Sequence, residues 1–192
     1  TGRVLPGRGA GLHLADEGRA EAERVAARIA VLSKRPVAVY ASPLERTRET
    51  AAPIARALGQ RVRIHRGLIE IDVGDWTGEE LQRLSKTTQW STVRSWPTGF
   101  RFPGGESFRA LSARTSEALV ELVDRHRGET FVAVSHADPI KAAVAAVAGI
   151  PLDLFQRLVI APCSVSALGF GSGGPFVLCV NSTASLSELV VS

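Results

Sequence analysis

One stretch of the chain, residues 130–141, constrains the fold more than any other. It begins with the apolar run Thr-Phe-Val-Ala-Val at 130–134, and a short run rich in β-branched residues is typical of a strand buried on both faces of a parallel sheet. Asp138-Pro139 follows shortly afterwards and predicts a helix start, with aspartate as the N-cap and proline at the first helical position. The stretch therefore predicts a buried strand that passes almost directly into a helix.

His136 lies between that strand and that helix. In open α/β sheets, ligands bind at this place, against the free N–H groups of a helix N-terminus. A histidine there is suited to donate to a phosphate oxygen, or to take part in proton or phosphoryl transfer. The alternative is an ordinary loop histidine bonded to a neighbouring carbonyl.

Strand and helix patterns alternate along the rest of the chain. Apolar runs and turn signals predict strands over 37–41, 61–65, 165–170 and 176–181, and helices that begin at Asp16 or cover 44–58, 79–94 and 107–126. This alternation predicts an α/β fold with a largely parallel sheet. We expect one domain over residues 1–192, with a lid or insertion at about 79–105.

Charge and composition exclude several classes of protein. The formal net charge is +4 with the basic residues scattered, which predicts no nucleic-acid partner but suits a small anionic substrate. No apolar run approaches the roughly 18 residues of a membrane span. The two cysteines, Cys163 and Cys179, are too few for a disulfide framework and lack metal-binding spacing. We therefore expect a soluble, cytoplasmic protein.

Two charged side chains lie where they could do chemistry. Arg46 falls in the first turn of a predicted helix, where an arginine can clamp a phosphate bidentately beside free helix N–H groups. The alternative is a surface arginine, although a cation at a helix N-terminus opposes the helix dipole. Glu70 interrupts the apolar run Leu-Ile-Glu-Ile, and partial burial would raise its pKa and suit a general acid. The alternative for Glu70 is an outward-facing residue of an edge strand.

Three aspartates raise the question of a metal site: Asp72, Asp75 and Asp138. A divalent cation needs ligands that converge, and Asp138 is better explained as a helix cap. We therefore expect no metal.

Three motifs in order resemble those of the histidine phosphatase superfamily. They are Ser-Pro-Leu-Glu-Arg-Thr-Arg-Glu-Thr-Ala at 42–51, Glu70 followed by Gly-Asp-Trp-Thr-Gly at 74–78, and Val-Ser-His at 134–136, with Glu-Gly-Arg at 17–19 before them. The similarity is to the phosphoglycerate mutase-like branch, which contains cofactor-dependent mutases, fructose-2,6-bisphosphatases, α-ribazole phosphatase and broad-specificity phosphatases. It implies a three-layer α/β/α fold with a mostly parallel central sheet.

The resemblance implies a phosphohistidine enzyme that needs neither metal nor cofactor. Arg46 would bind phosphate, Glu70 would be the proton donor, His136 would be the second histidine of the phosphate pocket, and Ala137 would offer its backbone N–H to the phosphate. Relatives usually have glycine in place of Ala137, and alanine still supplies that N–H. We expect hydrolysis of a small phosphomonoester. A phosphoglycerate mutase-type phosphotransferase is the alternative, although the chain lacks the long insertions and the Glu-Arg pair typical of the glycolytic mutases. A homodimer is left open.

The family's attacking histidine lies in an Arg-His-Gly triplet at the end of a first strand, and the sequence has no such triplet. The chain also contains no methionine and opens on a loop-like segment at Thr1. Because a sheet without that strand would leave unpaired edges, we expect the encoded protein to extend upstream with a strand ending in Arg-His-Gly or Arg-His-Ala. The alternative is a non-catalytic pseudo-enzyme that binds phosphate.

Aromatic residues crowd a short segment between the acid and the second histidine. They are Trp90, Trp96, Phe100 and Phe102, interrupted by prolines and a glycine. One interpretation is that two of them cap the sheet. The other is a lid whose aromatic side chains close over the leaving group, which predicts a preference for apolar or aromatic phosphoesters over highly charged sugar bisphosphates.

Overall fold

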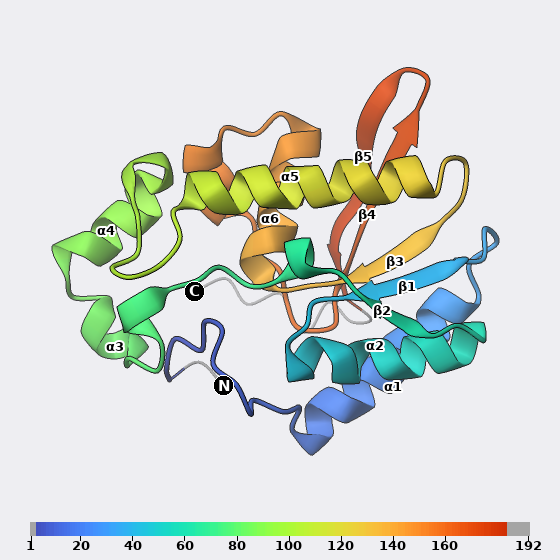
Figure 1. Cartoon of the computed structure of the whole chain (residues 1–192), viewed down its shortest axis with the longest axis horizontal. Helices are drawn as coiled ribbons and strands as arrows, with labels where there is room; N and C mark the ends of the chain where they lie inside the picture. The colour runs from blue at the N-terminus through green and yellow to red at the C-terminus, as the bar shows by residue number, and fades with distance from the viewer. Residues whose placement is uncertain (1–2, 184–192) are drawn as a thin grey trace.

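The computed structural model describes residues 3–183, and its elements alternate as the sequence predicts (Figure 1). The helices are α1 (Asp16–Ala30), α2 (Glu45–Leu58), α3 (Leu81–Leu84), α4 (Thr88–Ser95), α5 (Phe108–Arg125) and α6 (Ala137–Ala148). The strands are β1 (Ala38–Ala41), β2 (Val62–Ile64), β3 (Phe131–Val134), β4 (Val165–Gly171) and β5 (Gly174–Ser182). Four 3-10 helices connect them: η1 (Arg66–Leu68), η2 (Gly74–Trp76), η3 (Pro97–Gly99) and η4 (Leu152–Arg157).

The central sheet is parallel, with strand order β2-β1-β3. In its register, Val39 of β1 pairs with Val62 of β2 on one side and with Val132 of β3 on the other. The remaining strands, β4 and β5, form an antiparallel hairpin whose turn falls in the predicted glycine-rich segment. These strands confirm the predicted α/β fold with a parallel central sheet.

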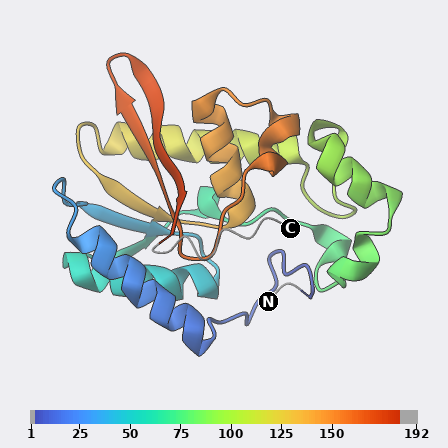
Figure 2. The same ribbon diagram turned by 180° about the vertical axis from the view of Figure 1, so that it is seen from behind.

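Helices cover both faces of this sheet, which gives the three layers that the resemblance implies (Figures 1 and 2). Successive side chains of a strand point to opposite faces. On one face, Val39 and Val132 pack with the apolar side chains of α1 and α2. On the other, Tyr40 packs with Leu122 of α5. The sheet is thus the middle layer of an α/β/α arrangement.

The carboxyl ends of the three parallel strands meet at one edge. The Ser42 N–H donates to the Val134 carbonyl oxygen at 3.0 Å, and the His65 N–H donates to the Ala41 carbonyl oxygen at 2.9 Å. The Ser135 hydroxyl then donates to the Leu68 carbonyl oxygen at 2.7 Å. The segments that follow β1, β2 and β3 are therefore tied together, and all the predicted site residues lie on or near them.

Two expectations about residues 130–141 are wrong. The strand buried on both faces is β1, whereas β3 is only partly buried and its Ala133 is exposed. Within residues 3–183, β3 pairs along one edge only, with β1. In addition, α6 begins at Ala137 and its N-cap is His136, because His136 has extended backbone angles. Asp138 is therefore inside the first turn, and its side chain is free for another contact.

The segment 79–105 folds into α3, α4 and η3. Its apolar side chains join a buried cluster that includes Trp76, Phe108 and Phe155, so the segment is packed onto the α/β body. Whether it acts as a lid stays a prediction. No helix within residues 3–183 is long and apolar enough to cross a membrane.

Candidate active site

A cavity of about 380 Å³ opens at the carboxyl edge of the sheet. Glu70 lines it, together with Asp138 and Lys141 from α6 and residues 5–7 of the N-terminal loop. Arg46 and His136 lie close enough to interact with one another electrostatically, and His136 Nδ1 is 4.0 Å from Glu70 Oε2. The structure therefore brings together the three side chains that the sequence identifies as candidates.

Glu70 lies in the irregular segment between η1 and η2, not on an edge strand, and its side chain is buried. Its Oε1 accepts the Ile71 N–H at 2.9 Å. Burial, and to a smaller extent the nearby Asp138 carboxylate, raise the pKa of Glu70 to about 8. The carboxyl is consequently protonated at neutral pH, which is the state that a general acid requires.

His136 ends the strand–helix junction as the N-cap of α6. Its Nε2 is 2.8 Å from the Ser42 hydroxyl, and the ring is buried. Burial, together with the positive charges of Arg46, Arg114 and Arg8, lowers the pKa of His136 to about 3. The imidazole is therefore neutral at neutral pH. When the Ser42 hydroxyl donates to Nε2, the single ring N–H is on Nδ1 and is available to a ligand oxygen.

Arg46 lies in the first turn of α2, and its guanidinium is half-buried. Its Nη2 donates to the Gly7 carbonyl oxygen at 2.9 Å, whereas the buried Nη1 has no hydrogen-bond partner among the described residues. Burial lowers the pKa of this guanidinium, and Glu70 opposes that shift. Because buried polar groups are nearly always paired, the Nη1 N–H groups are available to donate to the oxygens of an anionic ligand.

Ala137 is the first residue of α6. The first N–H groups of a helix have no intrahelical partner, and the helix dipole favours negative charge beside them. An anion held by Arg46 and His136 would meet this helix end. Within residues 3–183, no group of three or more histidines, cysteines or acidic residues could hold a metal ion.

Two residues at this site, Ser42 and Asp138, make side-chain contacts that the sequence does not predict. Ser42 is followed by proline, and this pair is typical of a helix start, but α2 has Leu44 as its N-cap, and the Ser42 hydroxyl contacts His136 instead. Asp138 also looks like a cap, but its carboxylate lies 3.5 Å from Lys141 Nζ on the cavity wall. Burial raises the pKa of Asp138 while Lys141 lowers it. In both cases the sequence identifies the region where a helix begins, but neither the cap residue nor the contacts of the side chain.

The aromatic segment divides into two parts. Trp90 and Phe102 line the cavity. Phe100 is buried against Trp76 in the core, with ring centroids 5.5 Å apart. Trp96 is 57% exposed and does not line this cavity, so Trp90 and Phe102, and not Trp96, are the aromatic residues of this segment that lie beside it.

Comparisons with known proteins agree on one family. Residues 2–183 match the family model described as histidine phosphatase superfamily (branch 1). Phosphoserine phosphatase 1 of Hydrogenobacter thermophilus is 33% identical over 156 residues, which cover 80% of this chain and 74% of that protein. A bifunctional protein of Mycobacterium tuberculosis is 32% identical over 152 residues, which cover 78% of this chain but only 42% of that protein. Among solved structures, YhfR of Bacillus stearothermophilus has a TM-score of 0.87 and 26% identity, covering 95% of this chain and 90% of that chain.

Proposed function

This chain belongs to branch 1 of the histidine phosphatase superfamily, an enzyme family of phosphatase and mutase type, and from that premise we propose that it hydrolyses small phosphomonoesters. One observation supports the proposal above the others. The unpartnered Nη1 of Arg46 is buried beside the raised-pKa carboxyl of Glu70 and the neutral imidazole of His136. An anion binder and a proton donor side by side are what cleavage of a phosphate ester needs.

The proposed reaction has two steps and no metal. A histidine nitrogen attacks phosphorus, the ester P–O bond breaks, and Glu70 gives its proton to the leaving oxygen. Arg46, His136 and the first N–H groups of α6 stabilise the charge on the equatorial oxygens. Glu70, now a carboxylate, takes a proton from water as the water attacks phosphorus and releases phosphate from the histidine.

We place the attacking histidine on a strand upstream of Thr1. Within the described residues, β3 is paired along one edge only and β4 is paired only with β5. Val134 of β3 and Val165 of β4 pack against the same apolar cluster, so one more strand between β3 and β4 would join the two sheets and pair both edges. Reading the encoding gene and measuring the intact mass of the native protein test this. A gene that starts at or near Thr1 would favour the phosphate-binding pseudo-enzyme.

The function itself is tested with the full-length protein and p-nitrophenyl phosphate in excess chelator. We expect turnover to be unchanged by the chelator, because the described site offers side chains and helix N–H groups for the phosphate. Loss of turnover on chelation would contradict the metal-free mechanism. A phosphoryl transfer between phosphoglycerates that is faster than hydrolysis would identify the mutase alternative.

Substitution of Trp90 by alanine should lower kcat/KM for aromatic phosphomonoesters by roughly fivefold, since an aromatic contact is worth about 1 kcal/mol. Trp90 lines the cavity and is partly exposed there. Glycerol phosphate should be affected less, because it has no ring to contact. A panel of steady-state measurements on both substrate types checks this.

Trp96→Ala is the matched control, because Trp96 lies in the same segment but away from the cavity. We expect it to leave both substrate types unaffected. A preference for phosphoserine, the substrate in the name of the Hydrogenobacter relative, would oppose the aromatic prediction. In that case, Asp138 and Lys141, which line the same cavity, would be the residues that select the leaving group.

A further inference from the structure

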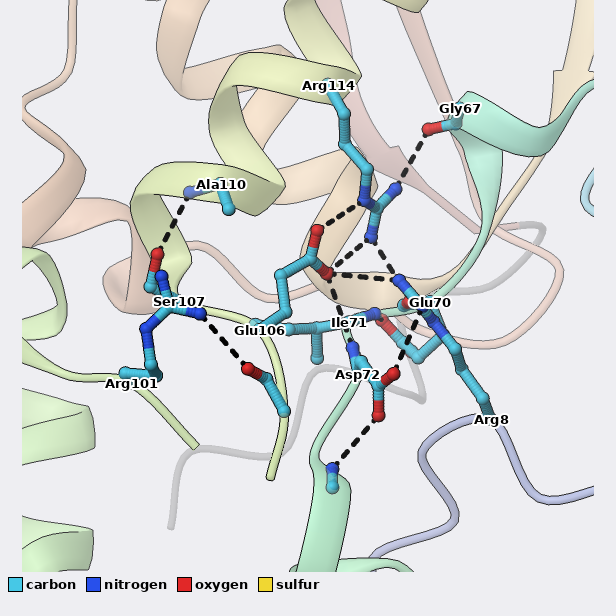
Figure 3. A network of polar contacts seen from close by, with 12 residues as sticks. Arg8, Gly67, Glu70, Ile71, Asp72, Arg101, Glu106, Ser107, Ala110 and Arg114 are labelled. Atoms are coloured by element: carbon cyan, nitrogen blue, oxygen red, sulfur yellow. Dashed lines mark hydrogen bonds and ion pairs between the residues drawn. The ribbon is translucent and has the colours of Figure 1, made fainter. Parts of the chain in front are cut away.

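A cluster of four charged side chains surrounds the backbone of Glu70 (Figure 3). Two are cations, Arg8 and Arg114, and two are carboxylates, Asp72 and Glu106. The formal charges balance, so the cluster adds no net charge beside the cavity. None of the four has a role in the proposed phosphoryl transfer, which leaves their function to be explained.

Arg8 uses all three of its guanidinium nitrogens in this cluster. Its Nε donates to the Glu70 carbonyl oxygen at 2.8 Å, its Nη1 to Asp72 Oδ2 at 3.3 Å, and its Nη2 to Glu106 Oε2 at 3.1 Å. These partners are 62 to 98 positions away in the sequence. A planar fork of donors can hold three acceptors at once, whereas a lysine ammonium on its flexible stem cannot reproduce that geometry.

Arg114 anchors the same carbonyl from the opposite side, on the rigid helix α5. Its Nη2 donates to the Glu70 carbonyl oxygen at 3.1 Å and its Nη1 to the Gly67 carbonyl oxygen at 3.0 Å. Glu106 accepts from its Nε at 2.7 Å and from its Nη2 at 3.0 Å. Glu70 lies in neither a helix nor a strand. The hydrogen bonds from these two guanidinium groups therefore fix its backbone in place of the regular backbone hydrogen bonds of a helix or strand.

The residue before Arg8 contacts the other half of the site. The Gly7 carbonyl oxygen accepts from Arg46 Nη2 at 2.9 Å. Gly7 has φ +46°, and a Cβ there would lie 2.5 Å from Val73 Cγ2, so the tight approach requires glycine. Two consecutive residues, Gly7 and Arg8, therefore hold the phosphate-binding guanidinium and the backbone of the acid.

We propose that Gly7-Arg8 sets the distance between the guanidinium of Arg46 and the carboxyl of Glu70, with Arg8 as a positioning residue that acts through Glu70. This inference rests on the proposed function. A misplacement of a catalytic group by about 1 Å can lower the rate on the order of 10²-fold. A residue pair that fixes the distance between Arg46 and Glu70 therefore has a large effect on the rate.

The test is the dependence of Arg8→Gln on the leaving group, in the full-length protein. We expect kcat/KM for an alkyl phosphate, whose leaving oxygen needs a proton, to fall by at least about tenfold. For p-nitrophenyl phosphate, whose leaving group needs little protonation, we expect less than about a threefold change. Arg8→Lys should behave like Arg8→Gln, because it keeps the charge but loses the fork.

A double-mutant cycle separates positioning from a structural role. If Arg8 acts through Glu70, then Arg8→Gln should have no further effect on the alkyl phosphate in a Glu70→Gln background. Arg101→Gln is the matched control, because this nearby arginine donates to the Gly105 carbonyl oxygen and has no contact with Glu70 (Figure 3). We expect it to change neither substrate, and thermal unfolding of each variant to show that it is folded.

Two results would overturn the inference while leaving the proposed function intact. One is an equal loss by Arg8→Gln on both substrates, or no loss, while Glu70→Gln still discriminates between them. The other is that Arg8→Gln lowers kcat/KM for the alkyl phosphate by the same factor in the Glu70→Gln background as in the wild type. If Glu70→Gln itself did not discriminate between the substrates, the proposed acid would be wrong, and the inference would fall with it.

Discussion

Replacing Arg46 by alanine should lower kcat/KM by on the order of 10²–10³-fold for every phosphomonoester, whatever its leaving group. The reason is the position of the buried Nη1, which has no partner among the described residues and lies in the first turn of α2. A guanidinium aimed at the phosphoryl oxygens acts on charge that every substrate develops. Its loss should therefore be uniform across leaving groups.

The measurement is kcat/KM of Arg46→Ala for an alkyl phosphate and for p-nitrophenyl phosphate, together with binding of inorganic phosphate by calorimetry. His136→Ala should follow the same pattern, because the imidazole lies beside Arg46 and Glu70 in the same candidate phosphate site. Arg48→Ala is the matched control, since Arg48 is exposed one half-turn further along α2. If Arg48→Ala lowered kcat/KM as much as Arg46→Ala does, Arg46 would only attract anions in general. If Arg46→Ala lowered kcat/KM for one substrate and not for the other, Arg46 would not contact the phosphoryl group.

Residues whose environment is local could be predicted from the sequence. The apolar run before His136, and the switch from strand to helix after it, are short-range patterns, and they place His136 correctly at the N-terminus of α6. The same holds for Arg46 in the first turn of α2. The parallel sheet follows because strands and helices alternate.

Side-chain direction could not be predicted in the same way. Asp138 and Ser42 both have residue types that favour N-caps, but the cap position depends on the backbone angles of the preceding residues, which tertiary contacts fix. A similar limit applies to burial: β3 has the more obvious apolar run, yet β1 is the strand paired on both sides. The pairing partners of a strand are not encoded in its own residues.

Arg8 is the clearest case of information that only the fold contains. It lies on an irregular loop, and its acceptors are Glu70, Asp72 and Glu106, far along the chain. No periodicity connects such positions. Trp90 and Trp96 show the same limit at short range. Trp90 is inside α4 and lines the cavity, whereas Trp96 lies at the break between α4 and η3 and is exposed.

Replacing Glu70 by glutamine should separate substrates by leaving group. For an alkyl phosphate we expect kcat/KM to fall by on the order of 10²–10³-fold, the usual worth of a general acid. For p-nitrophenyl phosphate the loss should stay below about tenfold, because its phenolate leaves with little help. Glutamine keeps the size of the side chain and an oxygen for the Ile71 N–H, so the comparison isolates the proton. Glu79→Gln, on an exposed ion pair with Arg83, is the control and should affect neither substrate.

The pH dependence gives a second, independent measurement of the same group. Burial and Asp138 raise the pKa of Glu70 from 4.5 to about 8, so wild-type kcat/KM for the alkyl phosphate should fall above about pH 8, and Glu70→Gln should lack this fall. Between pH 4.5 and about 8, Glu70 holds a proton in the native protein but not in the unfolded chain. The free energy of unfolding therefore decreases as pH rises through this window. Glu70→Gln should accordingly gain stability relative to wild type across that window and level off above it, measured by denaturant unfolding. If Glu70→Gln slowed both substrates equally and kept the alkaline fall, the general acid would lie elsewhere, and Asp72→Asn would be the next variant to measure.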